Sequence, residues 1–179
     1  VDMHSERSGY TLIELLICLV LISLVIVLLM SFFTANLNSF VRVKNDSELQ
    51  FQAQYVLNFI SNKVMNSGNI ADIITYENTR VINLSEEISI TRISLLYNQQ
   101  DSLCYIFEVR ENKIFYGNAK ADGSADAQLG KYISELKVSP FPSGITFAHA
   151  RALEITIKLA KDGETYEATQ LISMRGGRK

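Results

Sequence analysis

An apolar run near the amino terminus limits what this chain can fold into. Between residues 15 and 30 only Ser23 is overtly polar, and apolar residues extend the run from 12 to 33. Such a stretch has about the 20 residues that a helix needs to cross the hydrocarbon core of a bilayer. One acid, Glu14, lies near its start, where an ionised carboxylate at membrane depth costs about 2.5 kcal/mol or more. The sequence therefore predicts a membrane-spanning helix whose single acid requires an explanation.

The first explanation of Glu14 is local. Thr11 and Glu14 have the spacing of a capping box, in which the threonine is the N-cap and the glutamate reaches back to its amide. A carboxylate in the first helical turn is also favoured by the helix dipole. On this explanation Glu14 only begins an ordinary signal anchor.

The second explanation includes Gly9. Residues 8–16, Ser-Gly-Tyr-Thr-Leu-Ile-Glu-Leu-Leu, closely resemble the processing site of type IV prepilins and of the pseudopilins of type II secretion. In that family a short polar leader is removed after a glycine, the new amino terminus is N-methylated, and a glutamate is fifth in the mature chain. The resemblance implies cleavage between Gly9 and Tyr10, N-methylation of Tyr10, and Glu14 at the fifth mature position. Tyr10 stands where phenylalanine is usual, and Arg7 lies one place further from the glycine than the usual basic residue.

Other targeting signals fit this segment less well, and the distribution of bases indicates its orientation. The apolar run is longer than the h-region of a secretory signal, and no Ala-x-Ala-like site follows it. Arg7 precedes the run, and no Lys or Arg follows until Arg42. This asymmetry favours a cytoplasmic amino terminus and an extracytoplasmic head on a single-pass membrane protein.

Length and charge restrict the rest of the chain. The 179 residues leave room for one modest globular domain after the membrane span. The net charge of −2 predicts no broad electrostatic attraction to nucleic acid or anionic lipid. Cys18 lies in the apolar run and Cys104 in the remaining part, so no intramolecular disulfide is predicted, and we expect Cys104 to be a small core residue.

The helix is expected to continue well beyond the membrane. Neither Gly nor Pro occurs between Tyr10 and Ser67, and a helix of about 55 residues would be roughly 80 Å long. Its second half carries apolar residues at spacings of three and four, namely Leu49, Ala53, Val56, Ile60 and Val64. The polar residues 44–48 interrupt this stripe, as a solvated turn of helix or as a local break. Gly68 is placed to end the helix in the left-handed conformation.

From Ile70 onward the apolar pattern has the period of two that is typical of strands. A slip around Thr91 predicts a bulge or a turn, and apolar residues on both faces of 103–109 predict a central strand. Glu111-Asn112 and Asp162-Gly163 are hairpin turns, and a further turn is expected around Pro140 and Pro142. The predicted strands are 81–84, 88–90, 93–97, 103–109, 113–116, 132–138, 153–159 and 166–174.

Residues 117–130 are rich in Ala, Asp, Gly and Ser and are predicted to form a surface loop. Asp122 and Asp126 resemble the start of a calcium loop, but no closing glutamate follows at the right distance. We therefore predict no metal site, with these two aspartates as the only candidates.

The predicted fold class is α+β and pilin-like: a long N-terminal helix, with a transmembrane half and an amphipathic half, packed against an antiparallel β-sheet head. The expected segments are a leader (1–9), the transmembrane half (10–33), the amphipathic half (34–67) and the head (68–179). Within the family, the closing strand pair, the length of the head and the lack of a disulfide-bounded C-terminal loop resemble the PilW and GspJ group of minor subunits.

The chemistry of an enzyme is missing from the sequence. After removal of the leader His149 is the only histidine, and there is no phosphate-binding glycine loop and no metal-spaced set of Cys and His. No nucleophile has a plausible base. We therefore expect no enzyme and no cofactor, and a cell-surface hydrolase is the least favoured class.

The resemblance instead implies a minor pilin or pseudopilin that prepilin peptidase cleaves and methylates. Glu14 would accept the charged N-terminus of Tyr10 from a neighbouring subunit, near the tip of a type IV pilus, competence pilus or type II secretion pseudopilus. Implied partners are other major and minor pilins or pseudopilins and the platform protein of the inner (cytoplasmic) membrane, with no nucleic acid. The alternative is a signal-anchored extracytoplasmic domain protein that does not polymerise.

Overall fold

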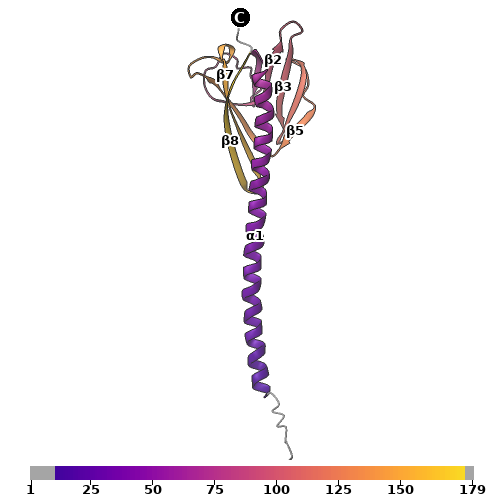
Figure 1. Cartoon of the computed structure of the whole chain (residues 1–179), viewed down its shortest axis with the longest axis vertical. Helices are drawn as coiled ribbons and strands as arrows, with labels where there is room; N and C mark the ends of the chain where they lie inside the picture. Colours follow the sequence, from indigo (N-terminus) through magenta and orange to yellow (C-terminus); the bar gives the residue numbers. More distant parts are fainter. Residues whose placement is uncertain (1–10, 176–179) are drawn as a thin grey trace, which may run out of the picture. The chain divides into compact units, whose positions relative to one another are not determined.

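The computed structural model describes residues 11–175, which form one long helix and a β-rich head (Figure 1). The chain divides into two compact units, Val1–Val43 and Lys44–Lys179, and each is treated by itself below. The elements are α1 (Leu12–Met65), β1 (Asn69–Thr75), β2 (Ile88–Asn98), β3 (Leu103–Arg110), β4 (Lys113–Lys120), β5 (Ala127–Lys131), β6 (Ile133–Phe141), a 3₁₀ helix (Phe147–His149), β7 (Ala152–Lys161) and β8 (Glu164–Ser173).

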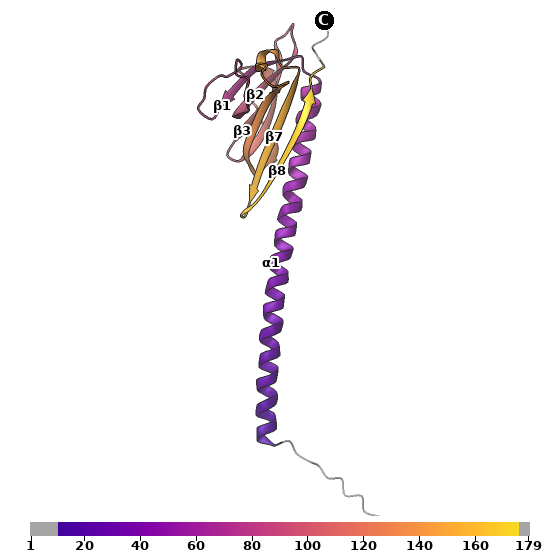
Figure 2. The same ribbon diagram turned by 90° about the vertical axis from the view of Figure 1, so that its left-hand side faces the viewer.

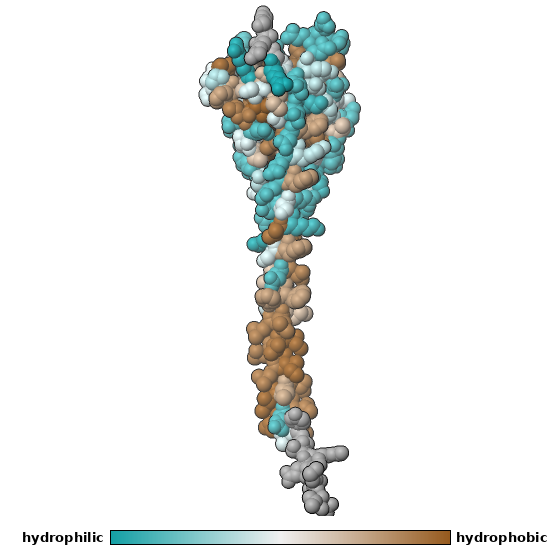
Figure 3. All heavy atoms as spheres, viewed as in Figure 1, coloured by the Kyte–Doolittle hydropathy of each residue, from teal (hydrophilic) through white to brown (hydrophobic). Residues whose placement is uncertain are grey.

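The first unit is a helical segment whose apolar side chains are exposed all along residues 12–43 (Figure 3). Several of its polar side chains bond to their own helix, as when the Ser23 hydroxyl donates to the Val20 carbonyl oxygen at 2.7 Å and the Ser31 hydroxyl to that of Val27 at 3.0 Å. Polar groups satisfied within the segment suit a lipid surrounding. Among the described residues, α1 is the one helix long and apolar enough to cross a membrane.

In the head unit, α1 presents an apolar face to the sheet, as predicted. The buried residues of this face are Leu49, Ala53, Val56, Leu57, Ile60 and Val64. Phe51 and Tyr55 lie outside this face and are exposed. The helix continues through residues 44–48, so a local break there is wrong. The solvated turn is right for Lys44 and Asp46 but not for Asn45, which is 5% exposed.

The end of α1 differs from the prediction at Gly68. The amide and the hydroxyl of Ser67 both donate to the Val64 carbonyl oxygen, at 3.0 and 2.7 Å, and close the last turn. Gly68 is not among the residues of positive φ. Its amide donates to the Leu96 carbonyl oxygen at 2.8 Å. Because that amide already pairs with β2, the chain passes directly into β1 and needs no left-handed cap.

The strands form an antiparallel sheet in the order β5-β4-β3-β2-β6-β7-β8, and β1 also pairs with β2. We call β1–β5 the first half-sheet and β6–β8 the second half-sheet. They are joined by β2 and β6, which pair at Ile88 with Val138 and at Ser89 with Lys137. The sheet lies along the second half of α1 in both orientations (Figures 1 and 2), which confirms the predicted α+β pilin-like fold class.

Several predicted strands change in number or length. β1 was not predicted, and residues 81–84 form a turn rather than a strand. The backbone of this turn bonds irregularly, with the Leu84 oxygen accepting from Phe147 and the Val81 amide donating to Ile73. Residues 88–90 and 93–97 belong to one strand, β2. The predicted slip in the apolar pattern is a bulge at Thr91 of β2. Thr75 of β1 pairs with Ile90, whereas Ile74 pairs with Arg92, so the register passes over Thr91.

The predicted surface loop over 117–130 is mostly strand. β4 continues to Lys120 and β5 begins at Ala127. The small residues here suggested a loop, but two of the glycines lie in strands where another segment approaches their backbone closely. A Cβ on Gly117, for example, would overlap the Ser124 carbonyl oxygen. Likewise a Cβ on Gly130 would lie 2.5 Å from a methyl group of Val56 on α1.

The two predicted hairpins and the central strand are confirmed. Asn112 and Asp162 have φ values of 56° and 49° at the turns, as two-residue hairpins require. In β3, Ile106 and Phe107 point to opposite faces and both are fully buried. The turn expected around Pro140 and Pro142 is confirmed at Pro142, whose carbonyl oxygen accepts from the Ile145 amide, whereas Pro140 lies in β6 and pairs with Leu153.

Candidate site for processing and assembly

Of the residues predicted for processing and assembly, Gly9 and Tyr10 lie outside the described residues. Glu14 is described, in the first turn of α1 and two residues after the start of the helix. The geometry of the site therefore begins at Thr11, the residue that precedes the helix.

Thr11 and Glu14 form the predicted capping box. The Thr11 amide and hydroxyl both donate to Oε2 of Glu14, at 3.0 and 3.1 Å, and the Glu14 amide donates to the Thr11 hydroxyl oxygen at 3.4 Å. Oε1 takes part in none of these three bonds. Since an ionised carboxylate has about four acceptor positions, the cap leaves Glu14 able to accept a further donor.

The side chains around Glu14 are apolar and exposed. Leu12, Ile13 and Leu15 are 86%, 68% and 59% exposed, and the exposed apolar surface continues to Phe33. Exposed apolar surface on this scale marks a membrane or protein contact. The site is thus one carboxylate at the start of an otherwise apolar helical surface.

A helix that is apolar in its first half and packed on an antiparallel sheet in its second half defines the chain as pilin-like in architecture. The family model for the prokaryotic N-terminal methylation motif matches residues 5–30, which include Gly9, Tyr10 and Glu14. This match supports a type IV pilin-family protein and implies processing by prepilin peptidase and pilin-type assembly. The apolar helix is consistent with membrane anchoring before assembly. No curated protein and no solved structure matches the chain.

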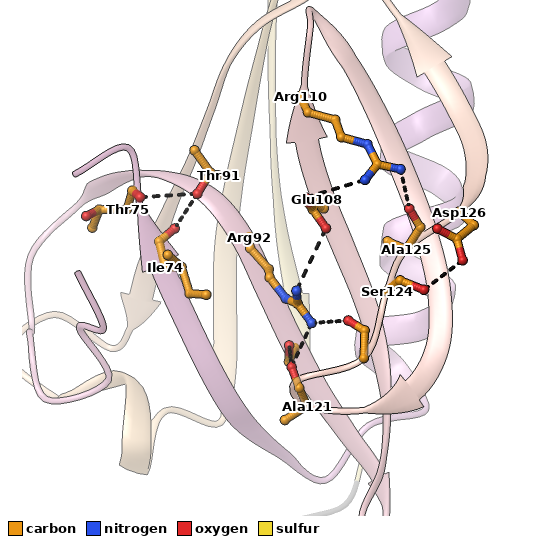
Figure 4. A network of polar contacts seen from close by, with 12 residues as sticks. Ile74, Thr75, Thr91, Arg92, Glu108, Arg110, Ala121, Ser124, Ala125 and Asp126 are labelled. Carbon is orange, nitrogen blue, oxygen red and sulfur yellow. Dashed lines mark hydrogen bonds and ion pairs between the residues drawn. The ribbon is translucent and has the colours of Figure 1, made fainter. Parts of the chain in front are cut away.

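The loop between β4 and β5 is fastened to the first half-sheet by two arginines (Figure 4). Arg92 donates to the carbonyl oxygens of Ala121, at 2.8 Å, and of Gly123. Arg110 donates to the Ala125 carbonyl oxygen at 2.8 Å. Both guanidinium groups also lie 3.8 Å from Glu108. We call residues 121–126 the strap, because they are tied across the sheet at both ends.

The strap contains both aspartates that were considered as metal ligands. The Ser124 hydroxyl donates to Asp126 at 2.7 Å, and the carbonyl oxygens of the strap accept from Arg92 and Arg110. Two guanidinium cations therefore already occupy backbone carbonyl oxygens of the strap, and their positive charge disfavours a further cation beside them. Within residues 11–175, no group of three or more His, Cys, Asp and Glu side chains is placed to hold a metal ion.

Both cysteines are free, and they differ in exposure. Cys18 is exposed on the apolar segment of α1, whereas Cys104 is buried on β3 next to Ile106 and Ala125 of the strap. Burial raises the pKa of the Cys104 thiol. The expected core role of Cys104 is confirmed.

A second polar cluster was missed by sequence reasoning. Glu48 on α1 accepts from Lys131 at the end of β5, at 2.7 Å, and from Lys161 at the end of β7, at 2.5 Å. Hydrogen bonds from Lys131 and Lys161 lower the Glu48 pKa from 4.5 to about 2. The signal available in the sequence was the interruption of the apolar stripe at 44–48, which placed an acid on the face that meets the sheet.

Proposed function

We propose that this chain is a minor pilin or pseudopilin, a structural subunit that is incorporated into a filament. The observation that carries the proposal is the methylation motif over residues 5–30, with Glu14 in the first turn of an exposed apolar helix. In this proposal prepilin peptidase cuts between Gly9 and Tyr10 and methylates the new amine. The chain is the substrate of that chemistry rather than an enzyme, and it needs no cofactor.

Glu14 would then accept the charged amino terminus of Tyr10 from a neighbouring subunit. The carboxylate is already held by Thr11 through one oxygen, so the other oxygen is available for an incoming ammonium group. In lipid the attraction between the two charges is poorly screened, and it offsets part of the cost of holding either charge there. The ion pair would fix the register of packed helices, and the apolar surface would supply most of their contact.

We place the subunit near the tip of a type IV pilus, a competence pilus or a type II secretion pseudopilus. The resemblance to the PilW and GspJ group and a head of about 110 residues support this placement, because a large head fits less readily into a densely repeated lattice. Before assembly the head would be extracytoplasmic and the amino terminus cytoplasmic. Partners would be other major and minor pilins or pseudopilins and the platform protein of the cytoplasmic membrane.

Intact mass of the protein from its native cell tests the processing step. We expect a mature chain that begins at Tyr10 and carries one added methyl group on its amino terminus, and we expect Gly9→Val to block processing without preventing membrane insertion. A retained leader in cells with active prepilin peptidase would contradict the proposal. That outcome would favour the alternative, a signal-anchored domain that does not polymerise, for which the capping box alone explains Glu14.

Glu14→Gln tests the assembly step, because glutamine can still cap the helix but carries no charge. We expect normal cleavage and impaired incorporation into filaments. Glu6→Gln is the matched control, since Glu6 leaves with the leader and its change should not affect incorporation. Wild-type incorporation of Glu14→Gln would return Glu14 to a purely local role.

The abundance of the subunit tests its position. Quantitative mass spectrometry of sheared filaments should find it scarce relative to the major pilin. A copy number similar to that of the major pilin would rule out placement at the tip while leaving the processing step intact.

A further inference from the structure

The two half-sheets of the head share few backbone contacts. Within the described residues, β2 and β6 pair only at Ile88 with Val138 and Ser89 with Lys137. In contrast, every residue of β8 from Glu164 to Ser173 pairs with β7. Backbone pairing therefore makes each half-sheet rigid but constrains the angle between them much less.

Tyr132 is the residue that connects the half-sheets along the chain, between the end of β5 and the start of β6. Its φ of 67° lies in the left-handed region, which is unfavourable for a bulky aromatic residue. Such a conformation persists only where the surroundings hold it in place. The contacts of Tyr132 must therefore supply that restraint.

Two lysines contact the side chain of Tyr132, and they come from different half-sheets. The ammonium nitrogen of Lys131 lies 4.6 Å from the centre of the Tyr132 ring, and that of Lys161 lies 5.2 Å from it. Lys131 also donates to the tyrosine hydroxyl oxygen at 3.1 Å. Cation–π contacts of this kind favour a fixed position of the ring.

Glu48 holds both of these lysines. Its Oε1 accepts from Lys131 and its Oε2 from Lys161, so one carboxylate of α1 joins the ends of β5 and β7. Lys131 is also the cross-strand neighbour of Lys113, and like charges at such positions repel. Without the carboxylate, the ammonium groups of Lys131 and Lys161 would also repel each other, and their hold on Tyr132 would weaken.

We propose that Glu48 is a latch that sets the angle between the two half-sheets, with Tyr132 as its pivot. In the closed state Glu48 draws Lys131 and Lys161 onto the tyrosine ring. Loss of the ion pairs lets the second half-sheet turn away from the first at the end of the head where Glu48 lies. The ion pairs are partly exposed, with side-chain exposures of 28% for Glu48 and 43% for Lys131, so salt weakens the latch.

Hydrogen exchange of the whole chain in detergent, followed by mass spectrometry, tests the latch. The reporters are the amide of Ile133, which donates to Asn112, and the amide of Ala160, which donates to Tyr132, each at 2.9 Å. We expect wild-type exchange at both amides to accelerate at least about threefold between about 0.05 and 0.5 M salt. Glu48→Gln should exchange rapidly at both salt concentrations.

Glu108→Gln is the matched control, because it removes the carboxylate that joins two other cations, Arg92 and Arg110. It should leave exchange at Ala160 unchanged. A second comparison uses Tyr132→Gly, since glycine adopts a positive φ without strain and needs no restraint. In that background Glu48→Gln should accelerate exchange at Ala160 by less than it does in the wild type.

Three results would overturn the latch. Wild-type exchange at Ile133 and Ala160 that does not respond to salt is one, and it requires no variant. The second is unchanged exchange at both amides in Glu48→Gln. The third is that Glu48→Gln accelerates exchange at Ala160 as much in the Tyr132→Gly background as in the wild type, which would mean that Glu48 only forms ordinary surface ion pairs.

Discussion

Gly130 lets β5 approach α1 so closely that a single added methyl group should destabilise the head. A Cβ at this position would lie 2.5 Å from a methyl group of Val56 and 3.3 Å from one of Ile114. Val56 and Ile114 are both fully buried. Neither neighbour can move aside freely in a packed interior, so we expect Gly130→Ala to cost about 1–3 kcal/mol of unfolding free energy.

A double-mutant cycle with Val56 tests the close approach of β5 to α1 more sharply. Val56→Ala removes two methyl groups, which costs about 1.6 kcal/mol of transfer free energy plus a term for the cavity, or about 2–3 kcal/mol in all. In the double variant the methyl group that Gly130→Ala introduces occupies part of that cavity. The two costs should then fall short of additivity by at least about 1 kcal/mol.

Urea unfolding of the full chain in detergent, monitored by circular dichroism of the sheet, measures all four variants of the cycle. A matched control pairs Val56→Ala with Gly163→Ala, because a Cβ on Gly163 meets nothing within 4 Å. That pair should be additive within about 0.5 kcal/mol. Additive costs for Val56→Ala and Gly130→Ala would refute the close approach of β5 to α1.

Three further predictions concern the head. Because Glu48 has a pKa near 2 when folded and 4.5 otherwise, its contribution to stability is complete above about pH 4.5 and is lost as the pH falls toward 2. Melting temperatures of wild type and Glu48→Gln should therefore converge over that range, and a constant difference would contradict this. Gly117→Ala should lift the strap and accelerate alkylation of Cys104 in a Cys18→Ser background, whereas Gly163→Ala should not. Phe107→Ala should lower the unfolding free energy by about 3–5 kcal/mol in urea titrations, and a loss below about 1 kcal/mol would contradict its full burial.

The elements that the sequence predicted best are those whose signal is local. The long helix follows from the absence of Gly and Pro, and its buried face follows from the spacing of residues such as Leu49 and Val56. The β7–β8 hairpin follows from Asp162-Gly163 and the alternation on both sides. In each case the backbone conformation and the side-chain period point the same way, so no distant contact was needed to decide the structure.

The capping box of Thr11 and Glu14 was predictable for the same reason. Thr11 and Glu14 lie three residues apart, and their hydrogen bonds depend only on the first helical turn. The methylation motif is likewise contiguous, within residues 5–30.

Tertiary contacts decided the features that the sequence predicted wrongly. Gly68 does not take a left-handed cap because its amide pairs with Leu96, a distant partner that local pattern does not specify. Small residues such as Gly117 and Gly130 have the composition of a loop, yet they lie in strands because another segment approaches their backbone closely. Whether such a glycine lies in a loop or in a strand therefore depends on which distant segment packs against it.

The Glu48 cluster shows the same limit for charged residues. Glu48 is 113 residues from Lys161 in the sequence and also far from Lys131, and the three meet only when the helix, β5 and β7 are in place. A polar residue within an apolar stripe faces solvent if no other segment packs on it. It forms an ion pair if the segment that packs on it brings a residue of opposite charge. The amino-acid sequence by itself determined the helix and its processing motif, whereas the identity of such long-range partners was decided by the packing of the head.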